Sequence, residues 1–405
     1  MRVLLVAGKG GVGKTTLAAA TAIAAARDGA RTLVVSTDPA HSLTDVLGMT
    51  GATGLAGEWR SASIPVPVPG APGELDVLQI DTRTRLDSAW TAVRTTVEGL
   101  LGGAGVDPLV AQEIAAVPGV DDVLALQEMG EHAQGYDALV VDCAPTAETL
   151  RLLALPEAFD RLVSRGFPID RRLARLLGPS GMTAASVDAL DALEHVSREL
   201  SAVRDLVTGP GSSVRLVTTP ERVVLAETHR ARTTLAMLGH HVDGVIVNRV
   251  AVGDEWPVAL AERHRDMLVA ARDRFADLPV RFAPYAGVEP VGVDQLVALA
   301  DIVVGTSDPL DLGAARADAE VRADGDRWFL DVSVPGAELA DLDIAVTEDG
   351  DLVVDLGPHR RVIALPPVLR RCEVSSASLD LTDAGQVVRV HFDRDLSRWS
   401  AGARS

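Results

Sequence analysis

Short, almost continuous apolar runs alternate with alanine-rich or amphipathic stretches in the N-terminal part of the chain. Val3–Ala7 is an apolar run that leads into a glycine-rich loop, Thr16–Arg27 has the composition of a helix, and Arg31–Ser36 is a second apolar run. Strand, loop, helix and strand in this order form a βαβ unit. Continuous apolar strands are typical of parallel sheets that are covered on both faces. The same pattern predicts further strands at Asp76–Ile80, Ala138–Val141, Ser213–Thr218 and Gly244–Val247.

Two longer segments interrupt this pattern. Apolar residues recur at helical spacing within residues 82–131 and 150–207, as at Leu173, Leu176 and Leu177. Both segments are long for simple crossovers, so we expect a helical subdomain on one side of the sheet. The Pro- and Gly-rich stretch Gly57–Glu74 is expected to be a loop. The predicted fold class for residues 1–310 is therefore α/β, with a mostly parallel central sheet and an inserted helical subdomain.

After residues 311–324, which we expect to form a linker, the pattern changes to short alternating strands. Turn residues such as Pro335-Gly336 and Asp349-Gly350 separate them. This spacing is typical of a small antiparallel β-sandwich, expected over residues 325–395. Its predicted strands are Trp328–Val334, Leu342–Val346, Asp351–Leu356, Arg361–Leu365, Glu373–Leu379 and Val387–Phe392.

Charge and cysteine content exclude several classes of function. The net charge of −19 over 405 residues argues against nucleic acid as a partner, because a phosphate backbone would be repelled. Two cysteines, Cys143 and Cys372, are too few for a disulfide framework and agree with a reducing cytosol. The longest apolar runs fall short of the roughly 18–20 residues that span a bilayer. We therefore expect no integral membrane segment and a cytoplasmic protein.

The loop after the first apolar run has the pattern G-x-x-x-x-G-K-S/T, which is the phosphate-binding P-loop. It contains the only two lysines of the chain, Lys9 and Lys14, and all other basic residues except histidine are arginines. Lys14 is expected to bridge the β- and γ-phosphates of ATP, and the Thr15 hydroxyl to bind Mg²⁺. The predicted nucleotide-binding residues of the loop are Gly8, Lys9, Gly10, Gly11, Val12, Gly13, Lys14, Thr15 and Thr16.

Two aspartates follow predicted strands, where ligands bind in open α/β sheets. Asp38 comes after the second apolar run, and Asp142 ends the strand at Ala138–Val141. We expect Asp142 to support the Mg²⁺ site without direct ligation. For a lone aspartate, a helix cap or turn is the alternative explanation.

Lys9, early in the loop, resembles the second lysine of the deviant P-loop ATPases, whose loop has the sequence GKGGVGKTT. In that group this lysine reaches the partner's nucleotide across a dimer interface. The resemblance implies a homodimer in which Lys9, Lys14 and Asp38 are catalytic, with Asp38 positioning the attacking water.

More specific motifs resemble the arsenite-pump and tail-anchored-protein-targeting ATPase family. The segment Asp38-Pro39-Ala40-His41-Ser42 resembles its switch I, and Asp142 through Arg151 resembles its switch II. The resemblance implies switch roles for Pro39, His41, Ser42, Ala144, Pro145 and Thr146, and it places Asn248 and Pro284 beside the adenine. It covers roughly residues 1–307.

The chain departs from this family at several positions. Glu148 replaces the usual histidine of switch II. The region Val252–Leu268 lacks the cysteine pair that binds zinc between subunits in the eukaryotic targeting factors, so we expect no zinc. Two cysteines are also fewer than the three with which the arsenite pump binds its metalloid. The chain holds one ATPase unit rather than two, which agrees with a homodimer.

The C-terminal strands resemble the α-crystallin domain of small heat-shock proteins, on the segment Phe329–Gly336 and the later strands. The principal hypothesis is an ATPase whose cycle opens and closes a surface for a hydrophobic client helix or membrane protein, in targeting or as a chaperone. Apolar residues of the helical subdomain would line this surface or pack in its core. The alternatives are the ATPase subunit of an anion exporter and a nucleotide-switched holdase with little turnover.

Overall fold

The computed structural model describes residues 1–36, 42–49, 63–79, 129–143, 202, 204–313, 319–325, 327–347, 350–382 and 385–394. They belong to two compact units, residues 1–212 with 288–310 and residues 213–287 with 311–405. The expected helical subdomain lies outside the described residues except at its margins, where residues 129–131 and 204–207 are helical.

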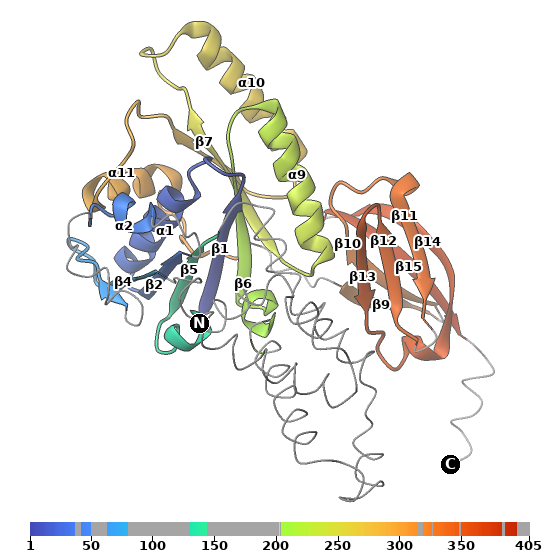
Figure 1. Cartoon of the computed structure of the whole chain (residues 1–405). Coiled ribbons are helices and arrows are strands. Elements are labelled where there is room, and N and C mark those ends of the chain that lie inside the picture. Colours follow the sequence, from blue (N-terminus) through green and yellow to red (C-terminus); the bar gives the residue numbers. More distant parts are fainter. Residues whose placement is uncertain are drawn as a thin grey trace, which may run out of the picture. The chain divides into compact units, whose positions relative to one another are not determined.

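The first unit contains a mostly parallel sheet with the strand order β3-β4-β2-β5-β1 (Figure 1). Strands β1, β2, β4 and β5 run parallel, and only β3 is antiparallel to its neighbour β4. Every residue of β5 is buried, as expected for a strand without alternation. The strands are β1 (Arg2–Gly8), β2 (Arg31–Ser36), β3 (Ile64–Pro65), β4 (Glu74–Gln79) and β5 (Ala138–Asp142).

Two helices of this unit pack on each other, α1 (Lys14–Arg27) and α11 (Val293–Val303) (Figure 1). The small side chains of α1 are buried almost throughout, which lets its neighbours approach closely. An exposed ion pair between Arg27 and Asp301 joins the two helices at 2.6 Å. A third helix, α2 (Ser42–Val46), also contacts α1.

The second unit begins with three parallel strands in the order β6-β7-β8 and two helices. Strands β6 and β7 are joined by a buried ion pair, in which the Arg215 guanidinium donates to both carboxylate oxygens of Asp243 at 3.1 and 2.9 Å. The Ser213 hydroxyl donates to the same carboxylate at 2.7 Å. The elements are β6 (Ser212–Thr218), α9 (Arg222–Met237), β7 (Val242–Val250), α10 (Val258–Arg274) and β8 (Val280–Pro284).

The C-terminal residues form the expected antiparallel β-sandwich, here called the β-domain (described residues 319–394). One sheet has the order β14-β15-β10-β9 and the other β11-β12-β13. Buried aliphatic residues and Phe392 fill the space between them. Short 3-10 turns, Leu339–Asp341 and Leu369–Arg371, precede β11 and β14. The strands are β9 (Ala319–Asp324), β10 (Arg327–Ser333), β11 (Leu342–Val346), β12 (Leu352–Leu356), β13 (His359–Ile363), β14 (Cys372–Thr382) and β15 (Gly385–Arg394).

Two segments differ from the sequence predictions. Strand β9 lies inside the expected linker, and it pairs antiparallel with β10 from Asp324 to Ala319. Strand β3 lies inside the expected loop Gly57–Glu74, where Ile64 and Pro65 pair with β4. Both are edge strands. β3 is two residues long and contains a proline, and the apolar positions of the alternating strand β9 are mostly alanines, which are weak strand formers. No helix among the described residues has the length and apolar character needed to cross a bilayer.

Candidate functional site

The glycine-rich loop connects the end of β1 at Gly8 to the start of α1 at Lys14. Gly11 has φ 78° and Gly13 has φ 94°, backbone conformations that favour glycine. Gly13 is the N-cap residue of α1, and it provides no side-chain hydrogen bond to the first turn. This turn also carries no acidic residue. A helix start of this kind presents backbone N–H groups and a positive dipole end to an anion.

The two lysines of the loop have different surroundings. Lys14 is only 6 % exposed, and its ammonium donates to the backbone carbonyl of Lys9 at 3.3 Å. The Lys9 side chain is exposed. Thr15, the predicted Mg²⁺ ligand, is half-buried on the first turn of α1, next to Lys14. The loop therefore holds one ammonium group inside and presents the other at its surface.

Asp142 lies at the same edge of the sheet as the loop. It ends β5 between β1 and β2, in register with Val6 on one side and with Ser36 on the other. The side chain is fully buried, and the Ser36 hydroxyl donates to its carboxylate at 3.1 Å. The parallel strands thus bring Asp142 close to the loop, because its neighbour Val6 on β1 comes only two residues before Gly8.

Most residues of the two predicted switches lie outside the part of the chain that the structure describes. Asp38, Pro39 and His41 of switch I and Ala144, Pro145 and Thr146 of switch II lie outside the described residues, as does Glu148. Ser42 is described and begins α2, which packs against α1. Cys143, also in the switch II motif, is 3 % exposed and follows β5 into the core.

Asn248 and Pro284 lie close together in the second unit, on neighbouring strands. Asn248 is on β7, where its side-chain oxygen accepts a hydrogen bond from the Arg249 backbone N–H at 2.8 Å. Arg249 itself has φ 58°, the one positive value among the non-glycine residues described. Pro284 ends β8 in register with Val250. The two residues thus lie near the ends of adjacent parallel strands, and their role beside the adenine stays a prediction.

An aromatic pair beside this corner was not predicted from the sequence. The rings of Trp256 and Tyr285 stack with centroids 4.9 Å apart and planes 21° apart. Tyr285 directly follows Pro284 and donates its backbone N–H to the Val250 carbonyl at 2.9 Å. No local pattern in the sequence indicates this stack, because the two residues are 29 positions apart.

The loop between β7 and α10 is fixed by a histidine. The His264 ring on α10 accepts a hydrogen bond at Nδ1 from the Ala251 backbone N–H at 2.9 Å. Burial lowers the pKa of His264, and nearby Arg263 lowers it too, while Glu221 opposes the shift. Only a neutral imidazole ring can accept a hydrogen bond at Nδ1. The lowered pKa therefore favours the neutral form of His264 that the bond from Ala251 requires.

Comparisons with known proteins agree with this geometry. The family model described as anion-transporting ATPase matches residues 1–305, and the model described as the HSP20-like domain found in ArsA matches residues 325–392. A Mycobacterium tuberculosis protein is 35 % identical over 98 % of this chain and 97 % of its own length.

Two further relatives carry names that state an activity. A Prosthecochloris vibrioformis protein named as an arsenical pump-driving ATPase is 32 % identical over 93 % of each chain. ATPase GET3B of Arabidopsis thaliana is 28 % identical over 74 % of this chain and 78 % of its own. Both resemblances inferred from the sequence, in the ATPase part and in the tail, are confirmed. With its P-loop geometry and a family match over most of its length, this chain belongs to the anion-transporting ATPase family.

Proposed function

We propose that this protein is a Mg²⁺-dependent, homodimeric ATPase that hydrolyses ATP to open and close a client-binding surface. The observation that carries the proposal is the loop Gly8–Thr16, which combines left-handed glycines, an uncapped helix start and a buried lysine. Family membership supports an ATPase. We assign this activity to residues 1–310, the helical subdomain to 82–131 and 150–207, and the β-sandwich to residues 325–395.

The residues at the loop fit a magnesium-bound triphosphate. Oxygen ligands such as a threonine hydroxyl suit Mg²⁺, and a buried carboxylate held by Ser36 can orient its water ligands. When bound, Mg²⁺ neutralises charge on the phosphates. Thr15 would hold the metal and Asp142 would support it.

The loop and the predicted residues outside it have separate roles in this mechanism. The N–H groups at the start of α1 bind phosphate oxygens, and Lys14 holds the β- and γ-phosphates from inside the loop. Asp38 orients the attacking water, as the resemblance implies. Asn248 and Pro284 bind the adenine, and the neighbouring Tyr285 extends the apolar surface for the base.

Lys9 is proposed to act on the nucleotide of the partner subunit. Lys9 is an exposed residue of the loop, where a second copy of the chain can meet it. A positive charge supplied from a partner stabilises the charge that develops on the transferred phosphoryl group. This role requires a homodimer in which each subunit can close over the nucleotide that its partner binds.

Subunit mixing tests the role of Lys9. Lys14→Ala removes ATP binding, and Lys9→Ala keeps binding but slows turnover. If Lys9 acts in the partner's site, a mixed dimer has one competent site, because the Lys14→Ala subunit still provides its Lys9 to the Lys9→Ala subunit. Random mixing of the two inactive variants should then restore about a quarter of the wild-type ATPase rate, since about half of the dimers are mixed.

Two outcomes would contradict this mechanism. If mixing restores no activity although mass spectrometry shows mixed dimers, Lys9 acts within its own subunit or not at all. If the wild-type protein is monomeric with saturating Mg·ATP and turns over at full rate, the homodimer is wrong. Loss of ATP binding in Lys9→Ala would instead show that Lys9 is only a binding residue.

A hydrophobic helix is the proposed client, and an exported anion is the alternative suggested by the family description and by the arsenical-pump relatives. Cys143 and Cys372 are 3 % and 7 % exposed and pack in the cores of their own units, so they are poor candidates for metalloid ligands.

The two alternatives are separated by two measurements on the purified protein. Nucleotide-dependent crosslinking to an apolar helical peptide, absent with a scrambled polar peptide, would support the client. Stimulation of the ATPase rate by arsenite or antimonite, retained after Cys143→Ala and Cys372→Ala, would support an anion site elsewhere. No crosslinking in any nucleotide state would rule out the client-binding surface.

A further inference from the structure

We propose that the β-domain is held on helix α9 by a joint that opens when the pH falls. The joint consists of residues 229–237 of α9 on one side and the Pro335-Gly336 turn and strand β13 on the other. All of these residues belong to the second unit.

Three polar contacts hold the joint. The Thr233 hydroxyl donates to the Pro335 carbonyl at 2.6 Å, and the Thr234 hydroxyl shares a 3.2 Å hydrogen bond with Nε2 of His359. The Arg361 guanidinium of β13 donates to the Ala236 carbonyl at 3.0 Å. Ala236 lies in the last turn of α9, where a cation is favourable, and its carbonyl also accepts a hydrogen bond from the Gly239 backbone N–H at 3.0 Å.

An apolar contact completes the joint. Met237, the last residue of α9, is 1 % exposed and belongs to the buried cluster that fills the β-domain. The β-domain therefore does not have a self-contained core, because a side chain from the ATPase part is one of its components. Opening the joint exposes this side chain, so the contacts around it decide how readily that happens.

The His229 ring lies directly under the Pro335-Gly336 turn. Gly336 has φ 74°, and a Cβ atom added there would collide with the ring of His229. Burial lowers the pKa of His229, and the positive charges of Arg274, Arg232 and Arg230 lower it further, against the opposing charge of Asp277. A protonated ring here would be a cation next to arginines under a close-packed turn.

The second histidine of the joint is also kept neutral. Burial lowers the pKa of His359 on β13. Of the arginines on the same strand, Arg360 pairs with Asp355 at 2.7 Å and Arg361 donates to α9. Protonation of His359 therefore adds a charge to a partly buried ring whose Nε2 faces the neutral Thr234 hydroxyl.

The direction of the pH effect follows from these shifts. Both histidines have a pKa below the ordinary value of 6.5 in the docked state, and opening the joint removes the part of each shift that comes from burial against the other side of the joint. The open form therefore binds more protons as the pH falls below about 6.5. Docking is at full strength above this pH and weakens as the pH falls through the lowered pKa values.

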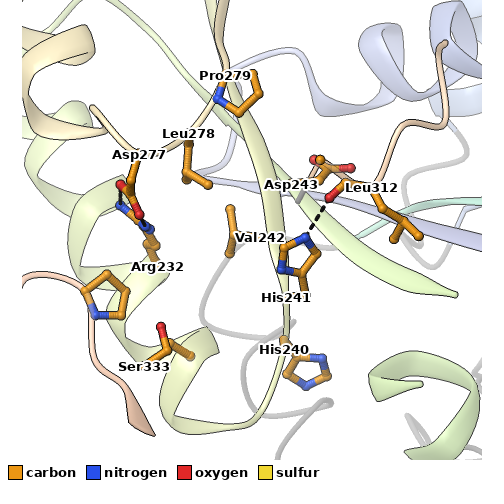
Figure 2. Close-up of a pocket in the computed structure, with 13 residues that line it drawn as sticks. Arg232, His240, His241, Val242, Asp243, Asp277, Leu278, Pro279, Leu312 and Ser333 are labelled. Atoms are coloured by element: carbon orange, nitrogen blue, oxygen red, sulfur yellow. Dashed lines mark hydrogen bonds and ion pairs between the residues drawn. The ribbon is translucent and has the colours of Figure 1, made fainter. Parts of the chain in front are cut away.

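The joint is not fully packed. A cavity of about 70 Å³ lies along it, with walls from both sides (Figure 2). Arg232 and Asp277, paired at 2.5 and 2.9 Å, line one wall, and Ser333 and Pro335 of the β-domain line another. Side chains that face a cavity have few neighbouring atoms on that side. When the β-domain leaves α9, these side chains therefore lose few van der Waals contacts.

Hydrogen exchange of the full-length protein between pH 7.5 and 5.5 tests the proposal. After correction for intrinsic rates, backbone amides of residues 229–237 and 334–337 should exchange severalfold faster at the acidic end, while those of β1 remain protected. The double variant His229→Gln/His359→Gln, whose side chains do not titrate, should lose most of this pH dependence. An unchanged protection pattern in the wild type, or the same pH dependence in the double variant, would overturn the proposal.

Two glycine variants define the open state. Gly336→Ala forces the turn off the His229 ring, so the joint should exchange rapidly even at pH 7.5. Gly357→Ala is the control, because Gly357 also has a positive φ, 54°, but nothing lies within 4 Å of an added Cβ. Thr233→Val, which removes the hydroxyl that donates to the Pro335 carbonyl across the joint and to the His229 carbonyl within α9, should move the opening to higher pH. Protection in Gly336→Ala equal to that of the control at every pH would contradict the proposed joint.

Discussion

A serine hydroxyl donates a hydrogen bond to the buried carboxylate beside the phosphate loop. Ser36 on β2 donates to Asp142 on β5 at 3.1 Å, in a region with no access for solvent. If Asp142 supports Mg²⁺, Ser36→Ala should raise the Mg²⁺ concentration that the ATPase needs. Groups that orient the ligands of a metal typically contribute about 10- to 100-fold in metal affinity or activity. The measurement is the Mg²⁺ concentration that gives half-maximal ATPase rate.

Thr21→Val is the matched control for this prediction. The Thr21 hydroxyl is also buried, but it donates to the Leu17 carbonyl within α1 at 2.7 Å and contacts no carboxylate through that bond. It should leave the Mg²⁺ requirement unchanged. Equal Mg²⁺ requirements in Ser36→Ala and the wild type would show that Asp142 does not act through the metal.

Residue-scale contacts of this kind were only partly predictable. The strand-end position of Asp142 followed from the apolar run before it, since parallel strands end at a common edge. Its partner Ser36 is 106 residues away, and no local pattern connects the two. The stack of Trp256 on Tyr285 was missed for the same reason, because it forms only when a loop folds over the end of β8.

At the scale of elements, the start of α1 gives the sharpest prediction. Gly11 has φ 78° with open space around an added Cβ, and Gly29, after the end of α1, has φ 99° with Pro72 at 3.9 Å. Alanine at either position should cost about 1–2 kcal/mol of stability from the left-handed backbone. Only Gly11→Ala should also weaken ATP binding, because its methyl group enters the space that the phosphates would occupy. Calorimetric titration with ATP and thermal unfolding measure the two effects.

Comparing Gly11→Ala with Gly29→Ala separates the effect of backbone strain on stability from an effect on ATP binding. If Gly29→Ala loses ATP affinity to the same extent, the effect comes from general destabilisation of α1. If neither variant loses affinity, the space beside Gly11 is not the phosphate site.

Helices and strands with a clear apolar pattern in the sequence were predicted with nearly correct bounds. Strands that depend on contacts with distant residues were predicted too short or missed. The first strand and α1 are encoded by Val3–Ala7 and the alanine-rich stretch that follows the loop. Strand β7 was predicted too short, because the buried Asp243 is polar and is acceptable there only with Arg215 on β6. Strand β9 was assigned to a linker, because Glu320 and Arg322 are exposed edge residues that pair with each other.

At the scale of the whole molecule, the β-domain is expected to unfold together with α9. Met237→Ala removes a fully buried side chain from the β-domain core and should cost about 2–5 kcal/mol. Hydrogen exchange should show loss of protection in the β-domain strands and in α9 at the same denaturant concentration.

The control for this prediction is Leu381→Ala. Leu381 is 86 % exposed at the end of β14, so its truncation should change stability by less than about 0.5 kcal/mol. If Met237→Ala destabilises α9 while every β-domain strand keeps its protection, the two do not share a core. The sequence predicted both parts separately, and the contact was not predictable because Met237 has the appearance of an ordinary helix residue.

The distribution of amino groups has a practical consequence for chemical modification. Apart from the terminal amine, only Lys9 and Lys14 can react with acylating reagents, and Lys14 is almost inaccessible. A mild reagent of this class should therefore attach to the side chain of Lys9 before any other. With the terminal amine blocked beforehand, one dye or one acetyl group per chain would then sit at the phosphate loop, without any engineered residue.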